Sequence, residues 1–283
     1  DSDGIEAKPV RIHVKLGISG EQATVDFTKS ANACASPLNA VRAITLAATY
    51  YAFRCLASEE LPSSGGIMRP LNVLTRPGSI CDAAYPSAVS SGNVETSQRL
   101  VDTLLGALSC CLPDTIPADS CGSMNNVLIG GMLPSEPEKS WVHYETLAGG
   151  CGGGPQFAGA SALHVHMTNT LNTPIEEIER LFPVQMVQYS VRPVNDNVSR
   201  YPGGAGIERH YRFLGSTTVT LMTERRTTAP YSLQDGEPGQ VGHNSLLRKD
   251  GTVLELPGKI SCRAEPGDTL IIRTPGGGGW GKA

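Results

Sequence analysis

The sequence predicts an α+β fold, with two main helices packed on antiparallel sheets and a β-rich C-terminal half. Both long stretches of helical periodicity lie before residue 113, whereas most later segments alternate apolar and polar residues between turn signals. Helices that precede a run of strands, and do not alternate with them, are typical of the α+β class. We expect residues 1–283 to form a single region, with an α+β part over 1–135 and a mainly β part over 136–283.

Two main helices and one short helix follow from spacing and from start and stop signals. The first is expected at residues 40–57 behind Asn39, a suitable N-cap, with Val41, Ile44, Ala48, Tyr51 and Cys55 at helical spacing. The second spans 95–112 and ends at Pro113, because proline cannot continue a helix. The third spans 175–181.

Strands are predicted where side chains alternate between turns. An N-terminal hairpin covers 10–27, a short strand covers 71–74, and residues 119–131 form a loop or short strand. The later strands are 184–192, the paired strands 207–213 and 217–225, a hairpin of 245–248 and 253–256, and 269–273. The glycines at 276–279 are expected to free the tail.

Composition excludes several classes of protein. The net charge of −4 does not suit a nucleic-acid binder, which needs a basic surface. No apolar run is long enough to cross a bilayer, and no signal peptide is visible, so we expect a cytoplasmic protein.

Only 18% of residues are charged. Either partner subunits cover much of the surface, or this is a glycine- and proline-rich β protein with short polar turns. The eight cysteines show no C-x-x-C pair, which favours reduced, buried thiols over a zinc site.

The densest chemistry lies between Trp141 and Glu179. It begins with Glu145 and a run of five glycines around Cys151, which lacks both the G-x-G-x-x-G spacing and a Walker lysine. The glycines therefore indicate close backbone packing, or a wall whose N–H groups face a substrate oxygen. Cys151 is a single cysteine with histidines only at a distance in the sequence, which gives weak support for a thiol nucleophile.

His164 and His166 follow, one residue apart. On a strand this spacing places both rings on one face, where they bind a metal, exchange protons, or hydrogen-bond as a structural pair. A third ligand is available only if the chain folds back to His143 or Glu145, so we expect no metal bound by this chain alone. Next, Thr173 and Glu176 form a predicted capping box around Pro174, although a helix N-terminus also suits an anion.

Several motifs together resemble the hydantoinase B/5-oxoprolinase family. They are DFTKS, SPLNAVRA, SGNVETSQR, YETLAGGCGGGP followed by HVHMTNTLNTPIEEIE, LMTERR with APY, and PGDTLIIRTPGGGGWG. The resemblance covers the whole chain in the family's order. It also extends to the related acetone and acetophenone carboxylases.

The resemblance implies an activity and partners. Members are subunits of ATP-dependent enzymes that open cyclic amides, in which a hydantoinase A-type subunit binds ATP and phosphorylates the amide oxygen. Family members are about twice as long, and their N-terminal half carries the His and Asp ligands of a divalent metal. ATP and metal are thus expected on partner chains. We expect this chain to be a C-terminal half that is split, cleaved or truncated, and active as an amidohydrolase subunit only in complex.

The residues expected at the site come from the central stretch. The proposed catalytic residues are His164, His166 and Glu145, and the proposed substrate-binding residues are Gly150, Gly152, Asn169 and Asn172. Two loops depart from the family's pattern, at 195–199 (NDNVS) and at Pro202, where an arginine is usual. A lysine and a serine also follow DFT, where a glycine is common. Two other readings remain: a subunit of a biotin-independent ketone carboxylase, and a non-catalytic half retained for assembly.

Overall fold

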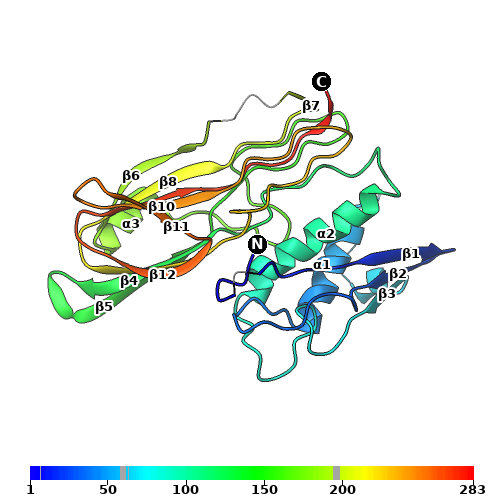
Figure 1. Cartoon of the computed structure of the whole chain (residues 1–283), viewed down its shortest axis with the longest axis horizontal. Helices are drawn as coiled ribbons and strands as arrows, with labels where there is room; N and C mark the ends of the chain where they lie inside the picture. The colour runs from blue at the N-terminus through cyan, green and yellow to red at the C-terminus, as the bar shows by residue number, and fades with distance from the viewer. Residues whose placement is uncertain (7, 58–61, 63, 194–197) are drawn as a thin grey trace. The chain divides into compact units, whose positions relative to one another are not determined.

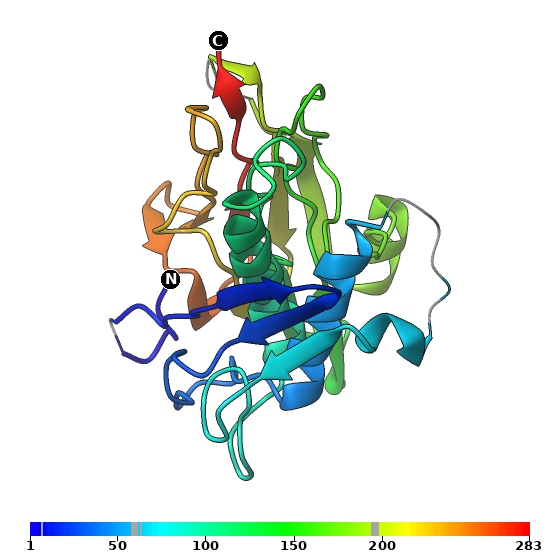
Figure 2. The same cartoon turned by 90° about the vertical axis from the view of Figure 1, so that its right-hand side faces the viewer.

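The computed structural model describes residues 1–6, 8–57, 62, 64–193 and 198–283, and it divides into two compact units (Figures 1 and 2). Unit 1 comprises Asp1–Pro117 with His166–Thr168, and unit 2 comprises Ala118–Val165 with Asn169–Ala283. The sequence placed a change of character at residue 135, whereas the two units divide after Pro117. Most of the NDNVS loop lies outside the described residues.

Unit 1 combines a small sheet with two helices. Its elements are β1 (Lys15–Ser19), β2 (Gln22–Asp26), α1 (Arg42–Arg54), η1 (Gly65–Met68), β3 (Leu71–Leu74), η2 (Gly92–Thr96) and α2 (Ser97–Ser109). β1 and β2 are antiparallel, while β3 runs parallel to β2, and Figure 2 shows the three strands side by side in blue and cyan. α1 packs on α2, whose buried face includes Leu100, Leu104 and Leu108.

Unit 2 contains two antiparallel sheets that share one core. The five-stranded sheet has the order β11 (Val253–Leu256), β10 (His243–Leu247), β13 (Thr269–Arg273), β8 (Ile207–Phe213) and β6 (Val184–Val191). The four-stranded sheet has the order β12 (Lys259–Ala264), β9 (Thr217–Met222), β4 (Asn126–Leu133) and β5 (Glu136–Glu145). β7 (Ser199–Tyr201) and β14 (Trp280–Lys282) form a separate pair, and α3 (Ile175–Leu181) precedes β6. Alternate residues of both larger sheets, such as Ile129 and Phe213, meet in a single hydrophobic cluster.

The α+β class is confirmed, and the main helices and most strands lie where periodicity placed them. One pairing was wrong: β8 and β9 are consecutive in sequence but belong to different sheets. β5, β7, β12 and β14 were not predicted as strands, and the glycines at 276–279 are buried and not free.

The predicted start of the first helix and its buried stripe differ from the structure in detail. α1 begins at Arg42 behind Val41, and the Asn39 side chain instead bonds to the backbone of Cys34, Ser36 and Ala88. Cys55, placed on the buried stripe, is exposed. All eight cysteines are free thiols, of which only Cys81 and Cys121 are fully buried. Among the described residues, no helix combines the length and apolar character needed to cross a membrane.

Candidate functional site

The two central histidines lie on irregular chain and not on a strand. The chain around them is irregular, and His166 occupies a turn with φ of 53°, in the left-handed region. His164 belongs to unit 2, and His166 belongs to unit 1. The expectation that one strand face carries both rings was therefore wrong, and each histidine is described within its own unit.

In unit 2, the carboxylate of Glu145 at the end of β5 is the centre of a buried polar cluster. Tyr211 Oη donates a hydrogen bond of 2.5 Å to Oε1, and Nη2 of Arg209 lies 3.0 Å from the same oxygen. Asn172 Nδ2 donates to Oε2 at 3.1 Å, and His143 Nε2 lies 3.5 Å from Oε1. This carboxylate is thus held on several sides.

The cluster keeps Glu145 ionised. Burial by itself raises the pKa of this carboxyl, but His143, the charge of Arg209 and the hydroxyl of Tyr211 together outweigh it and hold the pKa below its ordinary value. A carboxylate stabilised in this way is a weak proton acceptor. Glu145 is therefore suited to positioning its neighbours and not to acting as a general base.

Arg209 and Tyr211 were missed by the reading of the sequence. Both lie on β8, and the Arg209 side chain is completely buried beneath the ring of Tyr189, with 4.4 Å between its Cζ and the ring centroid. The signal was available, because Arg209 falls at a core-facing position in the alternation of Ile207, Tyr211 and Phe213. A charged residue at such a position requires a buried partner.

In unit 2, His164 has an imidazole ring whose nitrogens are not engaged by described residues. Both of its ring nitrogens are buried, and neither has a hydrogen-bond partner among the described residues. Burial lowers the pKa of His164 below its ordinary value, and the charge of Glu145 offsets only part of this effect. The ring is therefore neutral at pH 7 and keeps one nitrogen able to accept a proton.

His166 in unit 1 is engaged by side chains of α1 and α2. Tyr51 Oη lies 3.3 Å from Nδ1, and Asp102 Oδ1 lies 3.8 Å from Nε2. The Asp102 carboxylate also pairs with Arg99 at 2.5 Å. Burial lowers the pKa of His166, and Asp102 opposes this shift. Neither Tyr51 nor Asp102 was predicted as a functional residue.

The predicted substrate-binding asparagines differ from each other. Asn172 uses both ends of its amide, since Nδ2 also donates to Thr146 O at 2.7 Å and Oδ1 accepts from Tyr189 Oη at 2.9 Å. Asn169 is exposed. Asn172 therefore fixes the loop before α3, whereas the Asn169 side chain is accessible to a ligand. The predicted capping box is absent. Pro174 is the N-cap of α3, and no side-chain hydrogen bond caps the start of this helix.

The glycine run is used for backbone packing. A Cβ on Gly150 would collide with the carbonyl of Gly204, and one on Gly152 with that of Ala118. Their N–H groups already donate, to Pro275 O at 3.0 Å and to Ser120 Oγ at 3.1 Å. Because both N–H groups have partners within the chain, these contacts favour backbone packing, and the role of Gly150 and Gly152 in substrate binding stays a prediction. Cys151 is no activated thiol either, because burial raises its pKa.

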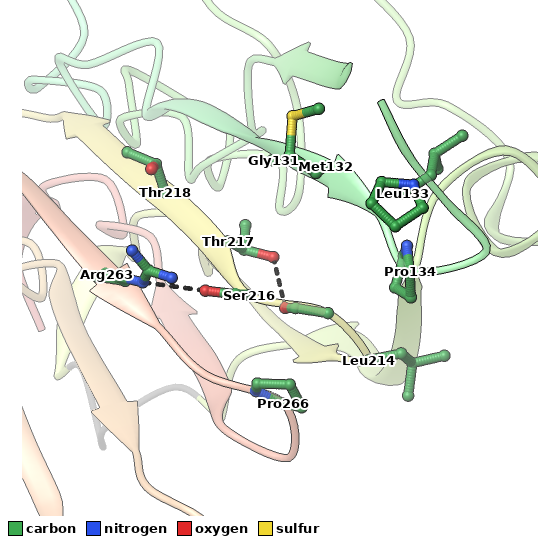
Figure 3. A pocket seen from close by; sticks show the side chains of 12 residues that line it. Gly131, Met132, Leu133, Pro134, Leu214, Ser216, Thr217, Thr218, Arg263 and Pro266 are labelled. Carbon is green, nitrogen blue, oxygen red and sulfur yellow. Dashed lines mark hydrogen bonds between the residues drawn. The ribbon is translucent and has the colours of Figure 1, made fainter. Parts of the chain in front are cut away.

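Each unit contains a cavity that its own described residues line. In unit 2, a cavity of about 520 Å³ lies near the ends of β4 and β9, where Arg263 Nε donates to Ser216 Oγ at 3.0 Å (Figure 3). None of the predicted catalytic residues lines it. In unit 1, a cavity of about 460 Å³ is lined by Tyr50, Tyr51 and Arg54 of α1 and by residues of η1. The described residues contain no group of three metal-ligating side chains.

Comparison with known proteins gives a consistent result. Residues 1–283 match the family described as hydantoinase B/oxoprolinase. An uncharacterised protein of Methanocaldococcus jannaschii is 40% identical over 97% of this chain and 47% of its own length. The 5-oxoprolinase of Dictyostelium discoideum is 38% identical over 96% of this chain and 21% of its own. The chain thus spans about half, or less, of the length of these relatives.

Two solved structures share the fold. The ATP-dependent caprolactamase from Pseudomonas jessenii superimposes with a TM-score of 0.81 at 21% identity, covering 95% of this chain and 48% of that one. Nucleotide-free acetone carboxylase gives a TM-score of 0.78 at 13% identity, covering 95% and 41%. At these identities the likeness establishes the fold alone.

Proposed function

Because the chain belongs to the hydantoinase B/oxoprolinase family, we propose that it is part of an ATP-dependent enzyme that opens cyclic amides. Relatives named 5-oxoprolinase and a neighbour named caprolactamase support this class of substrate. In the proposed reaction the chain completes ring opening after a partner has activated the amide.

The observation that carries the proposal is the state of His164. Its imidazole is held neutral by burial and has no hydrogen-bond partner among the described residues, although the family's central motif surrounds it. A neutral imidazole with a free nitrogen can accept the proton of an attacking water. In this proposal Glu145 and Asn172 hold the loop, and the exposed Asn169 orients the substrate.

Partners and cofactors are part of the proposal. ATP, when bound by a hydantoinase A-type subunit, supplies a phosphoryl group that turns the amide oxygen into a leaving group. We place the divalent metal on the chain that carries the N-terminal half of the hydantoinase B unit. In this proposal the residues of this chain contribute proton transfer and positioning.

The test uses the chain in the complex with which it co-purifies. ATP consumption and ring-opened product are measured with 5-oxoproline, hydantoin and caprolactam as candidate substrates. His164→Gln is expected to lower turnover about 100-fold, in the range usual for loss of a general base. His243→Gln is the matched control, because His243 is half-exposed and pairs with the exposed Glu255 at 2.5 Å.

Two outcomes would overturn the proposal. ATP turnover that requires bicarbonate and a ketone, with no cyclic amide opened, would identify a ketone carboxylase. Full activity of complexes that carry substitutions of His164, His166 or Glu145 would identify a non-catalytic half retained for assembly.

A further inference from the structure

We propose that Tyr189 is a positioning residue, which holds the loop of residues 169–172 in one conformation through a closed set of side-chain contacts. The members of this set, named here the Tyr189 cluster, all belong to unit 2 and are Glu145, Asn172, Tyr189 and Arg209. The loop carries the exposed Asn169, so the consequence for substrate binding rests on the proposed function. The anchoring of the loop rests on the contacts alone.

The contacts of the Tyr189 cluster run from residue to residue and return to the first. Tyr189 Oη donates to Asn172 Oδ1 at 2.9 Å, and Asn172 Nδ2 donates to Glu145 Oε2 at 3.1 Å. Glu145 Oε1 lies 3.0 Å from Nη2 of Arg209, whose Cζ lies 4.4 Å from the centroid of the Tyr189 ring. The cluster therefore connects the two larger sheets of unit 2 with the loop before α3.

A β-bulge in the edge strand β6, which lies beside β8 in Figure 1, brings the Tyr189 side chain onto Arg209. Met186 pairs with the core residue Tyr211 and packs against the same core. A regular strand would place Gln188 on that side as well and turn Tyr189 to the opposite face. The register instead shifts between Met186 and Gln188, so Tyr189 lies directly opposite Arg209 and shares its face. Bulges that redirect a side chain in this way are over-represented beside functional sites.

The buried charge of Arg209 explains why the Tyr189 ring stays in place. The Arg209 side chain is fully buried, and its Nε and Nη1 have no hydrogen-bond partner among the described residues. The guanidinium is held by the carboxylate of Glu145 and by stacking under the Tyr189 ring. Because the ring is stacked, the position of Tyr189 Oη is fixed, and with it the position of the Asn172 amide that accepts its hydrogen bond.

The loop itself is anchored on one side and open to solvent on the other. Asn172 Nδ2 also donates to Thr146 O at 2.7 Å, and Thr170 Oγ1 lies 2.8 Å from Thr146 Oγ1. Between these anchors the side chain of Leu171 is 97% exposed, and Asn169 is exposed as well. The backbone is thus held while two side chains remain accessible to a ligand. A binding loop that is ordered in advance costs less to order when the ligand binds.

Tyr189→Phe separates the anchoring of the loop from the shielding of the buried charge. The phenylalanine ring still covers Arg209, but the hydrogen bond to Asn172 Oδ1 is lost. The loop then spends part of its time in other conformations, and the apparent affinity for substrate falls by the fraction that remains competent. Substrate that does bind orders the loop again, so turnover of the bound complex is retained.

The first test is hydrogen–deuterium exchange of backbone amides, followed by mass spectrometry, in the complex that contains the full chain, without ATP or substrate. Tyr189→Phe is expected to speed exchange in the peptide that covers 169–173 by about fivefold, while peptides from β8 keep their wild-type rates. Tyr144→Phe is the matched control, because Tyr144 Oη donates to Asn126 Oδ1 at 2.6 Å and thus loses the same type of hydrogen bond elsewhere in unit 2. Exchange in 169–173 is expected to remain unchanged in this control.

A double variant tests whether Tyr189 acts through Asn172. Asn172→Ala is expected to speed exchange of the loop at least as much as Tyr189→Phe, because it also removes the contacts with Glu145 and Thr146. Adding Tyr189→Phe to Asn172→Ala is expected to cause no further increase, since the hydrogen bond that joins them is already absent. Increases that multiply in the double variant would overturn the inference.

The second test separates positioning from a merely structural role by kinetics. In the ring-opening assay, Tyr189→Phe is expected to raise KM about fivefold and to leave kcat within about twofold of the wild type. A structural role would instead lower the amount of folded complex, which lowers kcat and leaves KM unchanged. Unchanged exchange in the loop, or faster exchange with an unchanged KM, would overturn the inference. The exchange measurement uses no substrate. A complex that opens no cyclic amide but shows Tyr189-dependent exchange would therefore contradict the proposed function and leave the anchoring of the loop standing.

Discussion

At the residue scale, Glu145 is a candidate catalytic residue whose buried ion pair with Arg209 stabilises the fold. Its side chain is 4% exposed, and that of Arg209, its partner at 3.0 Å, is fully buried. Removing one member of a buried ion pair leaves the other charge without compensation. We expect Glu145→Gln to lower the free energy of unfolding by about 3 kcal/mol, as measured by urea denaturation.

The same substitution should change the dependence of stability on pH. The pKa of Glu145 is lowered in the folded state from its ordinary value of 4.5, so its charge stabilises the fold above that pH. This contribution is lost as pH falls through the folded pKa. The difference in stability between wild type and Glu145→Gln should thus shrink as the pH is lowered below about 4.5. A difference that stays constant from pH 7 to pH 3 would contradict the ionised state.

Tyr211→Phe is the control for this pair, because it removes one hydrogen bond and leaves both charges. Its hydroxyl donates to Glu145 at 2.5 Å. We expect a smaller loss, about 1–2 kcal/mol, in the same urea experiment. A loss as large as that of Glu145→Gln would show that the hydrogen bond from the Tyr211 hydroxyl, and not the ion pair, dominates this region.

Single residues also show where sequence reasoning reached its limit. The sequence placed His164, Glu145 and Asn172 in one neighbourhood, and in unit 2 Glu145 and Asn172 do meet at 3.1 Å. It failed for His166, since a positive φ in a non-glycine residue leaves no trace in a periodic pattern. It also missed Tyr51, because an aromatic residue at helical spacing looks the same whether it packs in a core or lines a cavity.

At the scale of elements, the glycine-rich segments form one closely packed layer in unit 2. Gly150 N bonds to Pro275 O, Gly277 N to Gly204 O, and Gly204 N to Cys151 O. A Cβ on Gly277 would collide with the backbone carbonyl of Cys151, which cannot rotate away as a side chain would. We expect Gly277→Ala to lower the free energy of unfolding by about 3 kcal/mol or more.

Gly17→Ala in β1 is the matched control. A Cβ there would meet nothing within 4 Å, so the same chemical change should be neutral or slightly stabilising. Thermal unfolding of both variants measures the contrast. If Gly277→Ala retained the wild-type midpoint, the layer would have to be looser than these contacts indicate.

The predictability of the elements follows from the range of the interactions that form them. Helices α1 and α2 and the β10–β11 hairpin depend on neighbours close in sequence, so periodicity and an Asp-Gly turn were sufficient. β8 and β9 look like a hairpin, yet β8 pairs with β6 and β13 while β9 pairs with β4 and β12. Pairing between distant strands is decided by the shared core, which local alternation does not specify.

At the scale of the whole molecule, the edge of the four-stranded sheet in unit 2 exposes several apolar side chains. β5 is the edge strand, and the paired β4 and β5 expose Leu128 (40%), Val142 (65%) and Tyr144 (52%). The opposite face of the same strands is buried in the core. An exposed apolar group on an edge strand favours association, which agrees with the small share of charged residues, 18%.

Under the proposed function another chain of the complex covers this face, and Val142→Glu tests that expectation. A charge at the centre of an apolar contact must be desolvated, so we expect association with the co-purifying chains to weaken at least tenfold, equivalent to about 1.4 kcal/mol. Ile18→Glu on β1 of unit 1 is the control, since Ile18 is 64% exposed and also lies in a strand. Sedimentation velocity of the purified complexes gives the fraction of chain that is bound, and circular dichroism verifies that each variant is folded. Equal association of the two variants would mean that this face remains exposed to solvent in the complex, and the low charge of the chain would then reflect its many short turns.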